Sequence, residues 1–241
     1  MKKFGQITIF IILGVILISI FLLLIYVKKS IFDVNNLIIP SQVKPVEVYV
    51  DSCISKLSKE ALIELQNGRI NHNDFFLNED LLAIEYYYDG YTNTMPDIVE
   101  LEEEFSIYIE DNLNECVSEF KIEGYSIEYG VPLVKTSFLQ DMVDISVNYE
   151  INIIKSDSNY KISEFMVSYP IKFLEIYQLA NEIVEGLVES EGLLDPDLIG
   201  NLEDNYLIYT SPLKDYGGII EIIDQTSPLD GKYYVLRFAY V

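Results

Sequence analysis

The sequence predicts an α+β protein, in which one N-terminal transmembrane helix precedes a domain of antiparallel strands packed with about three amphipathic helices. Three observations carry this prediction. Apolar residues recur at steps of three and four in three separate segments, which is typical of helices that bury one face. The segment Val143–Ile153 alternates apolar and polar residues, as a half-buried antiparallel strand does. An uncharged run of 24 residues, Phe4–Val27, precedes both patterns.

The run Phe4–Val27 predicts a membrane anchor over residues 1–29. A helix over residues 7–27 would be about 32 Å long at ~1.5 Å per residue, which matches the hydrocarbon core of a bilayer. A cleaved secretory signal has an apolar region of roughly 7–15 residues and a small-residue cleavage site, and this run has no such site. A buried core helix is disfavoured because the run is long and apolar on every face. The lipid bilayer is therefore the expected partner of this segment.

The charge of the remaining chain predicts its orientation. Lys2 and Lys3 precede the apolar run and Lys28 and Lys29 follow it, so the flanking basic residues barely distinguish the two orientations. Residues 30–241 hold 12 basic and 39 acidic residues, a net charge of −27. A short anchor followed by a large acidic domain favours a cytoplasmic N-terminus and an extracytoplasmic C-terminal domain at the cell membrane.

The first helix of the domain is predicted over Val46–Gln66, after a connector over residues 30–45 that Pro40 and Pro45 interrupt. Pro45 near its first turn and Gly68 after its end are usual boundary signals. The apolar residues of this helix share one face: Val46, Val50, Cys53, Leu57, Ala61 and Leu65. The domain as a whole is expected to span residues 46–241.

Two further helices are predicted. Asp97 and Glu100 have capping-box spacing, and Pro96 prevents an earlier start of the second helix. The apolar face of the second helix consists of Ile98, Leu101, Phe105, Ile109, Leu113, Cys116 and Phe120. Pro170 opens the third helix, which is expected to fray near Gly192. The apolar face of the third helix consists of Phe173, Tyr177, Ala180, Val184 and Leu187.

Strands are predicted elsewhere, with turns at Ser156–Asn159 and Asp230–Gly231. The strand that returns after the first turn is expected to pair with Val143–Ile153. Two shorter strands, Tyr125–Tyr129 and Leu133–Phe138, are expected in the same sheet. The predicted strands are Phe75–Leu77, Leu81–Tyr88, Tyr125–Tyr129, Leu133–Phe138, Val143–Ile153, Tyr160–Tyr169, Tyr206–Tyr209, Ile219–Ile223 and Tyr233–Val241.

Composition excludes several classes of function. The net charge is −23, whereas nucleic-acid binding requires basic side chains that neutralise phosphates, so no nucleic-acid partner is expected. One histidine cannot build a His-rich metal site, and two cysteines cannot build a zinc finger. No phosphate-binding loop or dinucleotide fingerprint occurs, because the pair Gly217-Gly218 lacks the further glycines at fixed spacing that these motifs contain. No cofactor, metal or catalytic residue is predicted.

Cys53 and Cys116 are the sharpest candidate pair. Each lies on the apolar face of its own predicted helix, so packing these faces together can bring the two sulfurs within bonding distance. An oxidising exterior favours a disulfide, which would stabilise the fold by roughly 4 kcal/mol in the chain-entropy model. Two separate buried thiols are the alternative. A catalytic CxxC motif is excluded because the cysteines are 63 positions apart.

Four other features receive structural interpretations. His72 lies in a polar turn beside Asp74, without a nucleophile motif, and is expected to be a solvated loop residue. Asp195–Gly200 resembles the start of a calcium loop, but Ile199 occupies a ligand position and Tyr206 replaces the required Glu, which leaves only loose calcium binding open. The third feature is an acidic run, Glu100, Glu102, Glu103 and Glu104, which is expected on a solvated helix face. The fourth is a tyrosine run, Tyr86, Tyr87 and Tyr88, which is expected in an ordinary sheet rather than in a recognition surface.

The N-terminus, Lys2-Lys3-Phe4-Gly5-Gln6-Ile7-Thr8-Ile9-Phe10, resembles the archaeal class III signal peptide of type IV pilin-like proteins. The resemblance implies cleavage by a prepilin-type peptidase between Gly5 and Gln6. It differs at Phe10, where pilins of this type carry a Glu that pairs with a neighbouring N-terminal amine. The whole chain is also similar to a group of archaeal membrane-anchored surface proteins of unknown activity, in "GQITIFIILG", "YVDSCISKLSKEAL", "YIEDNLNEC", "DISVNY" and "YPIKF…IYQLA". This similarity implies architecture and location.

These observations favour a single-pass, membrane-anchored cell-surface protein with a structural or binding role, whose partner would be a surface protein or polysaccharide. The alternative is a pilin-like filament subunit processed between Gly5 and Gln6. A membrane-anchored hydrolase is a third possibility, and it would need a convergent polar site that the sequence does not reveal. Paired carboxylates for glycoside cleavage are not selected by any spacing among the 39 acidic residues.

Overall fold

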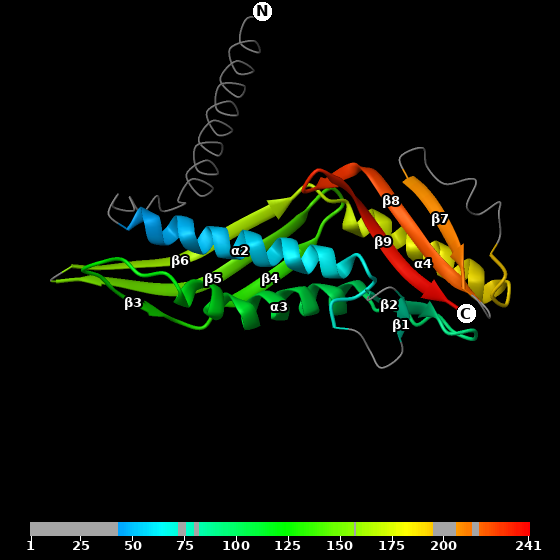
Figure 1. Cartoon of the computed structure of the whole chain (residues 1–241), viewed down its shortest axis with the longest axis horizontal. Coiled ribbons are helices and arrows are strands. Elements are labelled where there is room, and N and C mark those ends of the chain that lie inside the picture. Colours follow the sequence, from blue (N-terminus) through cyan, green and yellow to red (C-terminus); the bar gives the residue numbers. More distant parts are fainter. Residues whose placement is uncertain (1–42, 72–75, 80–81, 157, 195–205, 214–216) are drawn as a thin grey trace, which may run out of the picture. The chain divides into compact units, whose positions relative to one another are not determined.

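The computed structural model describes residues 43–71, 76–79, 82–156, 158–194, 206–213 and 217–241. The chain divides into two compact units, Met1–Lys44 and Pro45–Val241, and all described residues except 43 and 44 belong to the second. The described part is α+β, with three helices and two sheets (Figure 1), which confirms the predicted fold class of the domain. The predicted anchor over residues 1–29 lies outside the described residues. None of the described helices is long and apolar enough to cross a membrane.

Helices α2 (Lys44–Leu65) and α3 (Ile98–Ser118) lie side by side and run antiparallel (Figure 1). The carboxylate of Asp97 caps α3 by accepting hydrogen bonds from the backbone N–H groups of Val99 and Glu100, at 2.8 and 3.0 Å. All predicted apolar-face residues of α2 are buried: Val46, Val50, Cys53, Leu57, Ala61 and Leu65. On α3 the central part of the predicted face is fully buried: Leu101, Phe105, Ile109 and Leu113.

The first sheet is built around one long central strand. It consists of β3 (Ser126–Tyr129), β4 (Leu133–Phe138), β5 (Val143–Lys155) and β6 (Ser158–Tyr169). All pairs are antiparallel, and β6 follows β5 along one side. On the other side, β3 pairs with residues 151–154 and β4 with residues 143–148, so these two strands lie end to end along one edge. Pro132, which has no N–H to donate, lies in the break between them.

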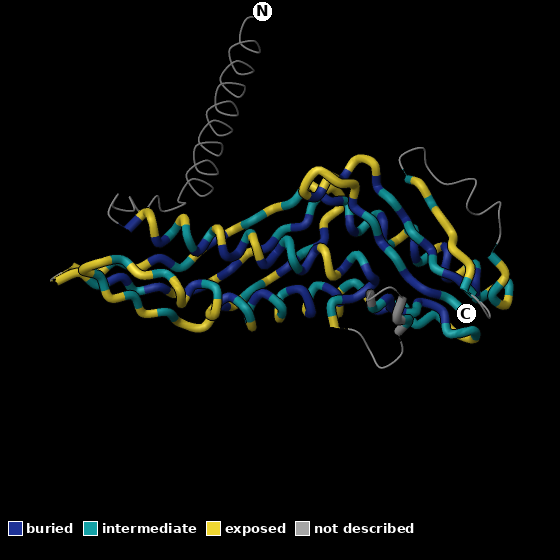
Figure 2. The backbone as a smooth tube through the Cα atoms, in the orientation of Figure 1, coloured by how far each residue is buried: buried dark blue, intermediate teal, exposed yellow. Residues whose placement is uncertain are grey.

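One face of the first sheet is buried against the helix pair. The apolar residues of β5 from Val143 to Ile153 are all buried, and the residues between them are more exposed (Figure 2), which confirms the half-buried strand that the alternation predicts. The buried set is Val143, Ile145, Val147, Tyr149, Ile151 and Ile153. The Tyr169 hydroxyl of β6 donates to the Ser55 carbonyl of α2 at 2.8 Å, and the hydroxyls of Ser106 in α3 and Thr136 in β4 lie 3.0 Å apart. Helices and sheet are therefore joined by hydrogen bonds as well as by apolar contact.

The second sheet contains the C-terminal strands. Its order is β1 (Phe76–Glu79), β2 (Leu82–Tyr88), β9 (Lys232–Tyr240), β8 (Gly218–Leu229) and β7 (Tyr206–Pro212). Neighbouring strands pair antiparallel, except that β2 and β9 are parallel. Helix α4 (Phe173–Glu189) packs on one face of this sheet, and the Tyr206 hydroxyl of β7 donates to Glu175 of α4 at 2.8 Å.

Aromatic side chains join the two sheets into one core. The ring of Phe173 in α4 lies 4.5 Å from that of Phe138 in β4 and 6.3 Å from that of Tyr234 in β9, between centroids. Tyr234 is fully buried, and its hydroxyl donates to the Leu62 carbonyl of α2 at 3.2 Å. The three helices and both sheets thus share a single core within the described residues.

Strand β8 differs most from its prediction, because it continues from the expected end at Ile223 to Leu229. A buried carboxylate makes this continuation possible. Oδ1 of Asp224 accepts hydrogen bonds from the backbone N and the hydroxyl of Thr226, both at 2.7 Å, where the pairing register shifts. The Ser227 hydroxyl donates to Asp224 and accepts from the backbone N of Lys172 at 3.1 Å. These hydrogen bonds stabilise β8 at the register shift between Asp224 and Pro228, and they connect it to Lys172 at the start of α4.

Candidate functional site

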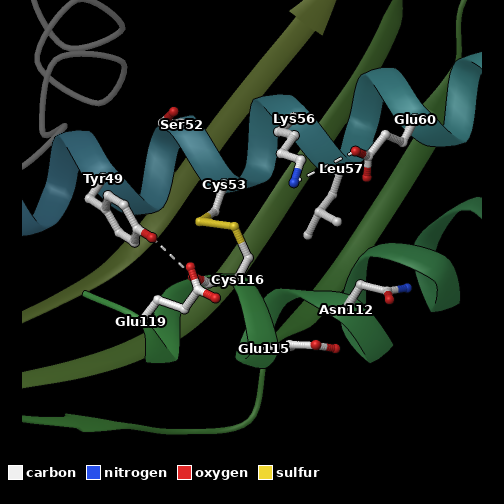
Figure 3. A pocket seen from close by; sticks show the side chains of 10 residues that line it. All are labelled: Tyr49, Ser52, Cys53, Lys56, Leu57, Glu60, Asn112, Glu115, Cys116 and Glu119. Atoms are coloured by element: carbon white, nitrogen blue, oxygen red, sulfur yellow. Dashed lines mark hydrogen bonds and ion pairs between the residues drawn. A yellow bond between two sulfur atoms is a disulfide. The ribbon is translucent and has the colours of Figure 1, made fainter.

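A groove of about 410 Å³ lies between α2 and α3, and the two disulfide-bonded cysteines are among the residues that line it (Figure 3). Because the two helices run antiparallel, the N-terminal half of α2 faces the C-terminal half of α3. The wall from α2 consists of Tyr49, Ser52, Cys53, Lys56, Leu57 and Glu60. The opposite wall consists of Asn112, Glu115, Cys116 and Glu119.

A disulfide joins Cys53 to Cys116 in this groove, with an S–S distance of 2.13 Å and a Cα–Cα distance of 5.9 Å. Each cysteine lies on the apolar face that the sequence predicts for its helix, so packing of the two faces brings the sulfurs together. Cys53 is almost completely buried, whereas Cys116 is half-buried. The predicted pairing is present in the structure.

Tyr49 closes one end of the groove. Its hydroxyl donates a hydrogen bond of 3.1 Å to the backbone carbonyl of Cys116, in the last turn of α3 (Figure 3). Carbonyls in the last turn of a helix have no partner within the helix, so this contact satisfies one of them. The Tyr49 ring also stacks on Phe120, with 4.4 Å between centroids. The aromatic contact and the disulfide together hold this end of the helix pair.

The groove is acidic. Glu60, Glu115 and Glu119 line it, and Lys56 is the basic residue among its lining side chains. Lys56 Nζ lies 3.8 Å from Oε1 of Glu60, and both side chains are well exposed, so this ion pair contributes little stability. Farther along the helix pair, burial raises the pKa of Tyr108, and the charges of Glu60 and Glu64 raise it further. The field along this side of the helix pair is therefore negative.

The chemistry available in the groove is that of a binding surface. Both cysteines are bonded, so neither provides the thiolate that a nucleophilic mechanism requires. Carboxylates accept hydrogen bonds and attract positive charge. Within the described ranges, no group of three or more His, Cys, Asp or Glu side chains could hold a metal ion. The groove can accept cationic donors such as lysine or arginine side chains.

The acidic run of α3 was expected on a solvated face, and this expectation is wrong for Glu104. Glu104 is buried, and its Oε1 accepts a hydrogen bond from Nε of Arg69 at 2.6 Å. Glu100 pairs with the same guanidinium, and Glu102 accepts from the backbone N of Phe138 in β4 at 2.7 Å. Glu103 is exposed, as expected. The antiparallel packing explains the difference, because it places the segment after α2 beside the first turns of α3.

Arg69 is buried, with 8% of its surface exposed. Burial alone would lower the pKa of its guanidinium, but the hydrogen bonds and charges of Glu104 and Glu100 outweigh this effect and raise the pKa. The guanidinium therefore stays charged and joins the end of α2 to the start of α3. This cluster holds the fold and is not an open site.

The other candidates have different outcomes. His72, Asp74, the segment Asp195–Gly200 and the processing site Gly5-Gln6 lie outside the described residues. Tyr87 and Tyr88 are buried in β2, and the Tyr87 ring stacks on Phe238 of β9 with 4.7 Å between centroids. The interpretation of the tyrosine run as ordinary sheet is confirmed.

Sequence reasoning missed the role of arginine. The chain has two arginines among its 16 basic residues, and each pairs with glutamate: Arg69 as above, and Arg237 with Glu221 at 2.6 Å between Nε and Oε1. This scarcity was a usable signal, because a planar guanidinium suits enclosed carboxylate pairs better than an ammonium does.

The described residues define an α+β domain whose two long helices are tied by a disulfide at the base of an acidic groove. Comparisons of the chain with protein-family models, with curated proteins and with solved structures give no match.

Proposed function

We propose that the chain is a single-pass, membrane-anchored cell-surface protein whose domain over residues 46–241 is extracytoplasmic and has a structural or binding role. The observation that carries this proposal is the Cys53–Cys116 disulfide, since such bonds persist in oxidising compartments outside the cytosol. The uncharged run Phe4–Val27 supports the anchor, and the net charge of −27 over residues 30–241 supports the orientation. The N-terminal resemblance to archaeal pilin-like signal peptides also supports a cell-surface location.

A binding role is supported by the α2–α3 groove. It is concave and acidic, and the disulfide fixes the separation of the two helices that carry its carboxylates. The complementary partner is a surface protein with exposed basic side chains. A lysine-rich peptide is a suitable probe, because its affinity should fall with added salt and with the Glu115→Gln/Glu119→Gln double substitution. The matched control is Glu103→Gln, which removes an exposed charge of α3 outside the groove.

We propose further that the domain has no catalytic activity of its own. The supporting observation is that two of its buried carboxylates have structural partners: Glu104 accepts a hydrogen bond from Arg69, and Asp224 accepts hydrogen bonds from Thr226 and Ser227. The purified full chain in detergent should be inert toward esterase, peptidase, phosphatase and glycosidase substrates. Reproducible turnover that disappears on replacing His72 or a carboxylate pair would contradict this proposal.

Protease accessibility tests the proposed topology. Protease added to intact cells should digest residues beyond Lys29, while a cytoplasmic marker protein stays intact. Digestion that occurs only after lysis would place the domain in the cytoplasm and contradict the proposal.

A pilin-like subunit is the second candidate, favoured by Gly5-Gln6 and Thr8 and opposed by Phe10. Sequencing the mature N-terminus from native membranes separates the two candidates. A start at Gln6 would support pilin-like processing, whereas an intact Met1 would support a plain anchor.

A further inference from the structure

Strand β7 forms an edge of the second sheet among the described strands, since β8 pairs with it on one side. Edge strands expose backbone N–H and C=O groups that can pair with another chain, and natural proteins protect them with short length, charges, prolines or bulges. The other described edges carry such protection. β1 has four residues, β3 and β4 are separated by Pro132, and β6 carries Lys161 and Glu164.

β7 is different, because none of its seven residues is charged and its proline is the last residue, Pro212. Two large side chains on its outer face are unusually exposed, Leu207 at 40% and Tyr209 at 53%. The register continues this face across the sheet as an aliphatic row, since Leu207 lies opposite Ile223, and Ile223 opposite Val235. The composition of β7 on this face therefore resembles that of a central strand more than that of a protected edge strand.

We propose that two copies of this chain pair through β7, antiparallel and centred on Ile208, so that their second sheets form one continuous sheet. In this register Leu207 of one copy lies opposite Tyr209 of the other, and the symmetry creates this pair twice. Aliphatic–aromatic pairs of this kind are favourable neighbours across antiparallel strands. Alternate residues of each β7 would direct their N–H and C=O groups to the partner strand. The inference goes beyond the proposed function and does not depend on the side of the membrane on which the domain lies.

The Leu207–Tyr209 pairs that two copies form favour a second copy as the occupant of this edge, and the local charge does not oppose it. A chain with a net charge of −23 repels itself across most contacts, so copies can associate only where the local charge is cancelled. The region beside Tyr209 meets this condition. Tyr209 lies opposite Glu221, and Glu221 is paired with Arg237 at 2.6 Å. The self-pairing places no like charges of β7 opposite each other, because the strand carries none.

Cysteine cross-linking of the full chain in detergent tests the register. Cys53 and Cys116 are bonded, so an added cysteine is the free thiol of the protein. With a short bismaleimide, Ile208→Cys should give a covalent dimer. A mixture of Leu207→Cys and Tyr209→Cys should cross-link faster than either variant alone. Leu207 and Tyr209 are exposed, so their cysteine variants should fold and still test the register if Ile208→Cys folds poorly. Association through the membrane helix alone would not make the mixture cross-link faster than the single variants. Equal cross-linking rates for the mixture and the single variants would therefore overturn the proposal.

A charge at the edge provides the second test. Tyr209→Lys should weaken dimer formation about tenfold or more, because the substitution is present in both copies and so removes both Leu–Tyr pairs and adds a charge to each β7 strand. The matched control is Tyr233→Lys, which adds the same charge at a tyrosine of β9 with 55% exposure. Equal dimerisation of the Tyr209→Lys variant and the parent, measured by light scattering, would also overturn the proposal.

Discussion

Nε of Arg69 donates to Oε1 of Glu104 at 2.6 Å, and this buried ion pair joins α2 to α3 at the end opposite the disulfide. One end of the helix pair is therefore held by a covalent bond and the other by a charged hydrogen bond. The groove lies toward the covalent end, where Tyr49 adds a further contact to Cys116. Both connections are long-range, so they fix how the two helices lie relative to each other.

Removing the disulfide should destabilise the domain considerably. The bond closes a loop between positions 63 apart, for which the chain-entropy model gives about 4 kcal/mol. The Cys53→Ala/Cys116→Ala variant should show a lower melting temperature by circular dichroism, and reduction of the parent should give a similar decrease. An unchanged melting temperature in both cases would show that the bond does not constrain the unfolded chain.

Breaking the Arg69–Glu104 pair should cost about 3 kcal/mol of unfolding free energy, because Arg69→Met leaves the buried Glu104 carboxylate without its guanidinium, and Glu104→Gln leaves the buried Arg69 paired with the more exposed Glu100. The single variants are Arg69→Met and Glu104→Gln, measured by denaturant unfolding. The double variant Arg69→Met/Glu104→Leu should be less destabilised than the sum of the single variants, since it removes both charges. Glu103→Gln is the exposed control on the same helix and should change stability little. Full additivity would contradict a direct interaction.

Alkaline pH should destabilise the fold through buried tyrosines. Burial raises the pKa of Tyr169 to about 12, and it also raises the pKa values of Tyr87, Tyr149 and Tyr234 above the usual 10.0. Above pH 10 these tyrosines ionise in the unfolded chain but remain protonated in the folded one. The stability that they contribute is therefore complete below pH 10 and decreases as the pH rises above 10, and the contribution of Tyr169 is lost as the pH rises through 12.

Denaturant unfolding at several pH values between 9 and 12 measures this loss. Tyr169→Phe should make the decline between pH 10 and 12 shallower, whereas Tyr233→Phe, at an exposed position, should leave it unchanged. A decline of equal steepness in the Tyr169→Phe variant would exclude a contribution from Tyr169.

Two glycines with similar backbone conformations should respond very differently to alanine. Gly217 has φ +79°, and a Cβ there would lie 1.9 Å from the Tyr240 carbonyl oxygen, so β9 would have to move. Gly124 has φ +81°, and a Cβ there would meet nothing within 4 Å. Gly124→Ala should cost about 1 kcal/mol from backbone strain alone, and Gly217→Ala should cost several times more by thermal or denaturant unfolding. Equal losses would show that the close approach to Tyr240 is unimportant.

Local patterns predicted the elements well because each has a strong periodic signal. The apolar face of α2, the central part of the apolar face of α3, the alternation in β5 and the capping residue Asp97 appear as expected. The disulfide followed from the same patterns, because each cysteine occupies the face that its helix buries.

Long-range pairings were not predictable from these patterns. The parallel pairing of β2 with β9 joins segments that are far apart in the sequence. Arg69 and Glu104 meet only because α2 and α3 run antiparallel, so the acidic run looked solvated when considered alone. The extension of β8 depends on hydrogen bonds of Asp224 with Thr226 and Ser227, which no hydropathy pattern reveals.

The most direct test of an extracytoplasmic domain is thiol labelling of a Tyr91→Cys variant. Tyr91 is 86% exposed, and the two native cysteines are bonded to each other, so the added thiol is the labelled group. A membrane-impermeant maleimide should label intact cells as completely as lysed cells. Labelling that appears only after lysis would place the domain in the cytoplasm and contradict the central claim.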